Sequence, residues 1–153
     1  MRVLLGIFPL LIIPVAIYNL IGLSYSGDEP ANGLVANASP MVDLLQSSAV
    51  TFPMISGVNW AVTNGEILIL FTIALLFMEI LKSTSTGTAT IMNHAISMIL
   101  FIVCLVEFLL LPNFATSVFF IITTMTLLDV LAGVVVTIVS ARRDFGVGEG
   151  FGG

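Results

Sequence analysis

The chain has 153 residues, of which 58% are hydrophobic and only 8% are charged. Soluble globular domains carry about 25% charged residues, so this composition excludes a water-soluble enzyme. Nine acidic residues against four Lys and Arg give a formal net charge of -5, and this excludes the basic surface that nucleic-acid binding requires. The chain is therefore expected to lie in a lipid bilayer.

Four stretches are long and apolar enough to cross a bilayer as helices. A membrane-spanning helix needs about 20 mostly apolar residues, and a lipid-exposed backbone has to satisfy its hydrogen bonds internally. The predicted helices cover residues 3–23, 65–81, 91–111 and 114–140. The fold class is thus an all-α integral membrane protein with a four-helix transmembrane domain over 1–141, an outer loop over 24–64 and a Gly-rich cytoplasmic tail over 142–153.

The first predicted helix contains two prolines. Pro9 and Pro14 each remove a backbone donor and are expected to kink this helix. With Arg2 before it and small residues over 24–26, the stretch also has features of a signal peptide. Its apolar run is longer than the usual signal core, which favours a retained membrane helix.

The basic residues are expected on one side of the membrane. Arg2 precedes the first helix and Lys82 ends the second. Arg142 and Arg143 end the fourth. Because cytoplasmic segments are enriched in Lys and Arg, both termini are predicted to be cytoplasmic, in a bacterial inner (plasma) membrane. These four residues and Trp60 are the predicted interface anchors.

The outer loop is too long for a simple connection. Ser39 followed by Pro40 resembles a helix N-cap with proline at the first helical position, which predicts a short interfacial helix. Trp60 ends an apolar but broken stretch and is expected at headgroup depth. We interpret residues 41–60 as interfacial; a re-entrant loop or a segment docked on a partner is the alternative.

Two short connections and the tail carry simpler expectations. Residues 83–90 are almost all Ser, Thr and Gly and are expected to form a flexible turn. The connection at Pro112 and Asn113 is so short that the third and fourth helices must be antiparallel neighbours. The Gly-rich tail lacks the strand and helix that flank a dinucleotide-binding loop, and it is predicted to be mobile.

Asp129 is the strongest functional signal. It lies near the middle of the fourth helix, where a charge costs about 2.5 to 3.5 kcal/mol. Thr126, Gly133 and Thr137 share its side of the helix, so this stripe should face protein or water rather than lipid. Gly133 and Thr137 have the spacing of a close packing seam in which Asp129 would be hydrogen-bonding glue. A proton or cation path is the alternative.

Three further ionisable residues are predicted inside the membrane. Glu107 lies beside the fourth helix but is not level with Asp129, so a carboxyl pair sharing one proton is not expected. Glu79 and His94 have matching depths, which predicts a contact between them. A structural ion pair, or two side chains that reach separately to water, is the other interpretation. Together the acids form levels about 10 Å apart, as on a proton or cation route.

The remaining motifs have structural explanations. Thr63 to Glu66 has the pattern of a capping box at the start of the second helix. Cys104 is the single cysteine, so neither an intramolecular disulfide nor a Cys-based zinc site is expected. With one histidine, a multi-His metal centre is also excluded. No cofactor is predicted, although His94 could ligate haem if two copies each supplied one ligand.

These features favour an accessory or assembly subunit of a larger membrane complex, or a homo-oligomer. The Asp129 stripe, the apolar outer loop and the Phe-containing tail each suggest a partner. The expected partners are the lipid bilayer and other membrane protein subunits or a second copy, with no nucleic acid. The alternative is a proton or cation channel or transporter subunit centred on Asp129. An enzyme is not favoured, because no nucleophile with an adjacent base is evident.

Overall fold

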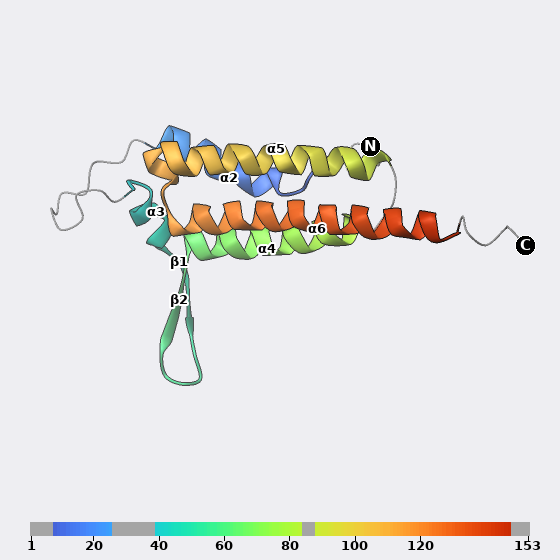
Figure 1. Ribbon diagram of the computed structural model, residues 1–153. Helices are drawn as coiled ribbons and strands as arrows, with labels where there is room; N and C mark the ends of the chain where they lie inside the picture. The colour runs from blue at the N-terminus through green and yellow to red at the C-terminus, as the bar shows by residue number, and fades with distance from the viewer. Residues whose placement is uncertain (1–7, 26–38, 84–87, 148–153) are drawn as a thin grey trace, which may run out of the picture.

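The structure is a computed structural model that describes residues 8–25, 39–83 and 88–147. The elements in these ranges are α2 (Ile12–Ser24), α3 (Val42–Gln46), β1 (Ser48–Pro53), β2 (Asn59–Thr63), α4 (Asn64–Ser83), α5 (Thr88–Leu110), the 3-10 helix η1 (Pro112–Phe114) and α6 (Ser117–Val147). Helices α2, α4, α5 and α6 run along one bundle, and the two strands form a hairpin that extends away from it (Figure 1). We call the end of the bundle that carries α3, η1 and the strands the hairpin end, and the opposite end the Lys82 end.

Three helices are long and apolar enough to cross a membrane. These spans are Asn64–Lys82, Ile91–Leu110 and Ser117–Val136. The α6 span is 44% buried and the other two are 17% buried, because α6 contacts both α4 and α5 and lies at the centre of the bundle. Helix α2 is apolar but has only 13 residues, so it is about 20 Å long against a hydrocarbon core of about 30 Å.

The predicted first helix over 3–23 is confirmed over 12–23 and wrong over 8–11. The chain before Ile12 is turned rather than helical, so Pro9 precedes α2 instead of bending it. Pro14 lies in the first turn of α2, where backbone N–H groups have no helical acceptor and proline is tolerated. A break before the helix therefore replaces the predicted kink. Residues 1–7, including Arg2, lie outside the described part.

The other three predicted helices are confirmed, with different ends. Helix α6 continues to Val147, so Arg142 and Arg143 lie on a helix and not in the predicted tail. No proline interrupts this segment, and alanine and arginine are good helix formers. The rest of the tail, 148–153, and the core of the predicted inner turn, 84–87, lie outside the described residues.

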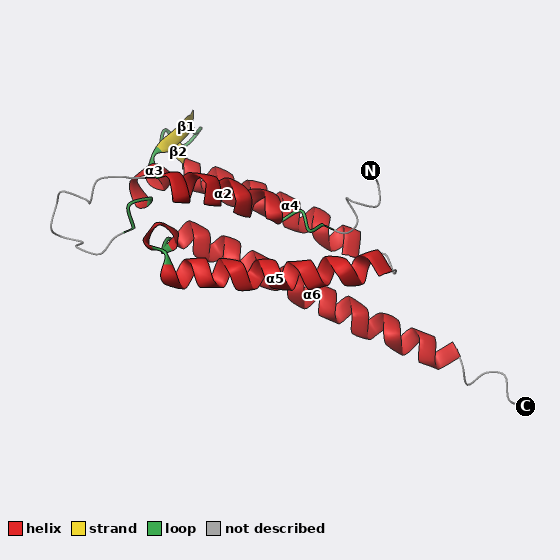
Figure 2. Ribbon diagram, turned by 90° about the horizontal axis from the view of Figure 1, so that it is seen from above, coloured by secondary structure: helices red, strands yellow, loops and turns green. Residues whose placement is uncertain are grey.

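Helices α5 and α6 are antiparallel neighbours, as their short connection predicted (Figure 2). At this connection an aromatic cluster attaches α2 to the bundle. The ring of Tyr18 lies 5.4 Å from that of Phe114 and 4.6 Å from that of Phe119, measured between centroids. The Tyr18 hydroxyl lies 2.7 Å from Thr116 Oγ1 and donates to the Asn113 carbonyl at 3.0 Å. Apolar packing and neutral hydrogen bonds thus hold the hairpin end together.

The outer loop contains a β-hairpin that the all-α prediction missed. Strands β1 and β2 are antiparallel, with Val50 opposite Val62 and Phe52 opposite Trp60. Gly57 in the turn has a positive φ of 82°, the left-handed conformation that glycine adopts without steric cost. Alternating β-branched and aromatic residues around a Ser-Gly turn are typical of a hairpin, and hydropathy by itself does not distinguish such a hairpin from an interfacial segment.

The short helix predicted in the same loop is present as α3. Ser39 Oγ accepts a hydrogen bond from the Met41 N–H at 3.3 Å. The helix begins at Val42 with Met41 as its N-cap, so the predicted cap at Ser39 and Pro40 is wrong by two residues. Met41 and Leu45 are buried. Helix α3 therefore packs its apolar side onto the bundle.

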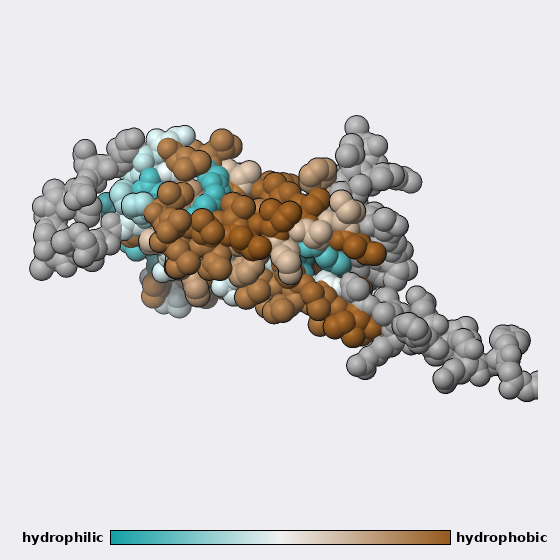
Figure 3. Space-filling model, turned by 45° about the horizontal axis from the view of Figure 1, so that its top comes forward, coloured by the Kyte–Doolittle hydropathy of each residue, from teal (hydrophilic) through white to brown (hydrophobic). Residues whose placement is uncertain are grey.

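The surface between the two ends of the bundle is mostly apolar (Figure 3). Each of the helices α2, α4, α5 and α6 exposes large hydrophobic side chains, among them Leu20, Phe77, Ile99 and Leu131. Such a contiguous apolar surface would be unfavourable in water. It agrees with helices that lie in a bilayer.

Candidate functional site

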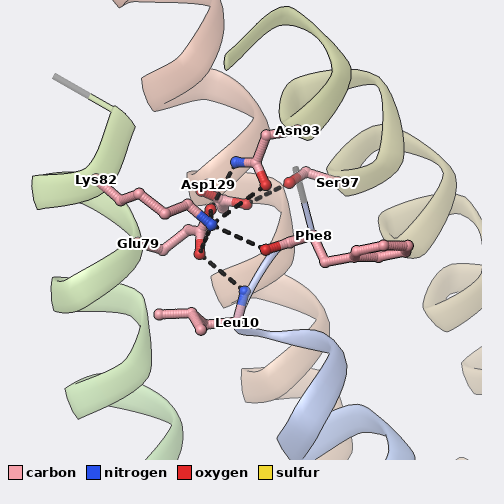
Figure 4. Close-up of polar contacts among 7 residues, drawn as sticks. All are labelled: Phe8, Leu10, Glu79, Lys82, Asn93, Ser97 and Asp129. Atoms are coloured by element: carbon pink, nitrogen blue, oxygen red, sulfur yellow. Dashed lines mark hydrogen bonds and ion pairs between the residues drawn. The ribbon is translucent and has the colours of Figure 1, made fainter. Parts of the chain in front are cut away.

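Polar side chains from three helices meet inside the bundle near the Lys82 end (Figure 4). This buried polar cluster consists of Glu79 and Lys82 of α4, Asn93 and Ser97 of α5, and Asp129 of α6. All except Lys82 are at most 1% exposed. Because buried polar groups are costly unless they are hydrogen-bonded, the partners of each residue indicate what the cluster can do.

Glu79 has three hydrogen-bond donors around its carboxylate. It accepts from the Leu10 N–H at 2.8 Å and from Asn93 Nδ2 at 2.6 Å. Lys82 Nζ lies 2.8 Å from Oε1 and 3.0 Å from Oε2. Residues three apart on a helix are neighbours, so Lys82 can neutralise Glu79 from the same helix. The acid is thus paired and hydrogen-bonded as a buried charge requires.

The non-helical chain before α2 provides backbone groups that contact Glu79 and Lys82. Backbone groups at the start of a helix have no helical partners. Here the Leu10 N–H donates to Glu79, and the Phe8 carbonyl accepts from Lys82 Nζ at 2.9 Å. The ion pair of α4 therefore holds the chain that leads into α2. Sequence reasoning missed this contact, because Leu10 and Glu79 lie 69 positions apart in the chain.

Asp129 faces α5 and not the lipid. Its Oδ2 accepts a hydrogen bond of 2.6 Å from Ser97 Oγ, and both residues are 1% exposed. The prediction that this acid turns inward is confirmed. Thr126 is also buried, but its hydroxyl donates to the carbonyl of Thr123 at 2.7 Å, so it does not pair with Asp129. Ser97, which does, was not predicted.

His94 packs on Gly133, one helical turn from Asp129. A Cβ atom on Gly133 would overlap the imidazole ring of His94, so the glycine makes room for it. The predicted contact between His94 and Glu79 is wrong, because Asn93 occupies the carboxylate instead. Consecutive helical residues point about 100° apart, so only one of these two neighbours can face α4.

Three polar atoms near this position lack a partner. Within the described residues, both ring nitrogens of His94 and Oδ1 of Asp129 are buried and have no hydrogen-bond partner. This part of the cluster has unused hydrogen-bonding capacity, whereas the Glu79 part is satisfied.

Glu107 and Glu66 lie elsewhere. Glu107 accepts from Asn19 Nδ2 at 3.1 Å and forms no pair with Asp129, as predicted. Glu66 completes the predicted capping box, in which Oε2 accepts from the Thr63 N–H at 2.8 Å and Thr63 Oγ1 accepts from the Glu66 N–H at 3.2 Å. Among the described residues, the acids are therefore held by separate partners and not by one chain of hydrogen bonds.

The remaining predicted site residues are not part of the cluster. Trp60 lies on β2 and is 50% exposed. Thr137, Arg142 and Arg143 are residues of helix α6. Gly133 lies at the α5 and α6 seam as the packing prediction required. The predicted anchor Lys82 instead turns inward to Glu79.

A metal or haem finds little support in the described residues. They contain no group of three or more His, Cys, Asp and Glu side chains placed to hold a metal ion. Both ring nitrogens of His94 are buried within the chain. This position does not favour an axial haem ligand shared between two copies, since the iron must reach a nitrogen directly.

Comparison with family models, with characterised proteins and with solved structures finds no match to the chain. The contacts of the buried polar cluster and the exposed surfaces of the bundle are therefore the available indications of function.

Proposed function

We propose that the chain is a small integral membrane protein that serves as an accessory or assembly subunit of a larger membrane complex or of a homo-oligomer. In this proposal it crosses a bacterial inner membrane four times, with both termini in the cytoplasm. Lys82 and the end of α6, which carries Arg142 and Arg143, lie at one end of the bundle (Figure 1). The hairpin end has no cation over 39–64, which supports this orientation.

The observation that carries the proposal is the apolar face of the hairpin. Paired residues of antiparallel strands share a face, and the faces alternate along each strand. The register and the turn thus put six apolar side chains on one face: Val50, Phe52, Met54, Val58, Trp60 and Val62. The opposite face carries small or polar residues such as Thr51, Asn59 and Ala61. Of the six apolar residues, all but Val62 are 46% to 65% exposed.

A hairpin of this kind needs a surface to pack on. A two-stranded hairpin is marginally stable alone in water, and exposed strands are usually protected by charged residues. Residues 48–63 contain none, and the described sheet has only these two strands. Because the hairpin extends away from the helices (Figure 1), we expect another protein subunit to cover the apolar face.

The buried polar cluster does not itself call for a partner subunit, although the sequence suggested that Asp129 would need one. Asp129 was expected to need a partner subunit, but Ser97 of the same chain binds it. Glu79 and Glu107 likewise find partners within the chain. The bundle can therefore fold around its own acids, and the case for a partner rests on the hairpin.

Photocrosslinking in native membranes tests the proposal. A benzophenone amino acid at Phe52 or Trp60 should give protein adducts of defined mass, and the same probe at Ala61, on the opposite face, should give fewer. An adduct of twice the chain mass would identify a homo-oligomer. Adducts to lipid alone at positions 52 and 60 would reject the partner and leave an interfacial hairpin.

A proton or cation path is the second candidate. It is favoured by the unpartnered buried atoms of Asp129 and His94, because ionisable groups inside a membrane mark such paths. In reconstituted vesicles Asp129→Asn should abolish a measured flux, while Thr124→Ala on the exposed side of α6 should preserve it. The absence of flux in the parent protein would reject this candidate.

A further inference from the structure

An apolar groove lies between α2 and α4 at the hairpin end, closed on one side by α3. Its volume is about 360 Å³, within the range of sites that enclose small ligands. Its walls include Ile17, Ile21, Leu44, Leu45, Ile67 and Phe71. The groove is separate from the buried polar cluster and from the apolar face of the hairpin.

The groove exists because α2 is attached to the bundle on its other side. Tyr18 packs on Phe114 and Phe119. A Cβ atom on Gly22 would lie 3.2 Å from the Phe114 ring, which shows how closely α2 approaches η1. Tyr18 and Gly22 thus direct one side of α2 to η1 and α6, and the groove lies on its side toward α4.

Helix α3 is held in place as the end wall of the groove. Asn64 Nδ2 donates to the Leu44 carbonyl at 3.1 Å and to Ser47 Oγ at 2.7 Å. A Cβ atom on Gly65 would lie 3.1 Å from the Leu45 carbonyl, so the glycine lets α3 lie against α4. These contacts form the groove before any ligand binds, and a preformed site loses less conformational entropy on binding.

The position and polarity of the groove indicate its occupant. Its rim residues Ile17, Ile21, Ile67 and Phe71 are 37% to 44% exposed and belong to the apolar surface of the bundle. The polar groups of Asn64 and Ser47 lie at its hairpin end, where the α4 span begins. An amphiphile with its head at that level would place its chain along α2 and α4.

We propose that the groove binds one acyl chain of an outer-leaflet phospholipid as a resident lipid. This inference rests on the four-crossing placement in the proposed function, but it requires no partner subunit. An acyl chain in a bilayer is already out of water, so its binding is favoured by van der Waals contacts and not by the hydrophobic effect. The walls at Ile21 and Ile67 provide contacts that a lipid on a smooth helix surface would not have.

Photolabelling from the lipid tests the groove. The full chain is reconstituted with a phospholipid that carries a diazirine in one acyl chain, and the labelled residues are mapped by mass spectrometry. Labelling should be several-fold higher at 17–21 and 67–71 than at Leu131 and Val135, which are also exposed, at 50% and 59%. Ile21→Trp should fill the groove and reduce labelling there to the level at Leu131.

Controls separate this inference from the proposed function. Leu131→Trp should leave labelling of the groove unchanged, and the unfolding midpoint of each variant reports whether it has folded. If Ile21→Trp fails to fold, Ile67→Trp replaces it. Equal labelling of groove and non-groove residues would overturn the proposal, as would a protein adduct from a crosslinker at Ile21 in place of lipid. Neither result changes the crosslinking expected at Phe52.

Discussion

The two ends of the bundle differ in which side chains they bury and which they expose. At the Lys82 end, charged and polar side chains are inside, and Glu79 is fully buried between donors from α4, α5 and the chain before α2. At the hairpin end, aromatic rings form the core and apolar side chains such as Ile55 and Val58 are exposed. The comparison separates two roles: the Lys82 end is built to hold the helices together, and the hairpin end offers surfaces to other molecules.

Substitutions at the two ends should therefore change the free energy of unfolding by different amounts. Removal of one partner of a buried ion pair leaves an uncompensated charge in a low dielectric and costs about 3–5 kcal/mol. A substitution on an exposed surface usually changes stability by about 0.5 kcal/mol or less. Stability and association are therefore expected to respond to different residues.

The largest effect is expected for Glu79→Ala. It would leave the Lys82 ammonium without its counter-ion and the Leu10 N–H without its acceptor. It should therefore lower the free energy of unfolding by about 3–5 kcal/mol, as measured by denaturation in mild detergent. Glu66→Gln on the same helix is the matched control, because glutamine also completes a capping box. If both variants lose equal stability, the contrast between a buried and an exposed acid is wrong.

An intermediate effect is expected where α5 meets α6. Gly133→Ala would place a methyl group in the His94 ring, and such overpacking costs about 1–3 kcal/mol. His94→Ala in the same chain should restore most of the loss, because the double variant removes the overlap. Unfolding of the two single variants and the double variant measures the coupling. Strictly additive losses would show that the ring and the glycine do not constrain each other.

The smallest effect on stability is expected at the hairpin. Phe52→Ser should change the free energy of unfolding by about 0.5 kcal/mol or less, since its side chain is 49% exposed. The same variant should lose the partner in a native pull-down, whereas Ala61→Ser on the other face should retain it. A loss of stability as large as that of Glu79→Ala would instead make the hairpin part of the folded core.

Local patterns were sufficient for much of the bundle. The apolar runs predicted the helices α4 to α6, and the connection at Pro112 predicted the pairing of α5 with α6. The capping box from Thr63 to Glu66 was also correct. Each of these features depends on residues within a few positions of one another, and their physical causes can be evaluated without the rest of the chain.

Contacts between distant segments were not predictable in the same way. The hairpin lies where hydropathy predicts a broken interfacial stretch. Pro9 precedes α2, although its position in the apolar run predicts a kink within a helix. Asn93 and not His94 binds Glu79, from 14 positions away. Which of two neighbouring side chains faces another helix depends on the rotation of both helices, and this rotation is set by packing across the whole bundle.

The amino-acid sequence alone determined that the chain forms helices long and apolar enough to cross a membrane. It also determined that Asp129 turns inward, because hydropathy and the cost of a charge in lipid can be evaluated for each residue separately. Tertiary structure decided which groups satisfy the acids, since Ser97 and the Leu10 N–H become partners only when separate segments meet. It also decided which surfaces remain uncovered. The apolar face around Phe52 and the groove beside Ile21 result from the pairing of strands and helices, which no single stretch of residues can specify.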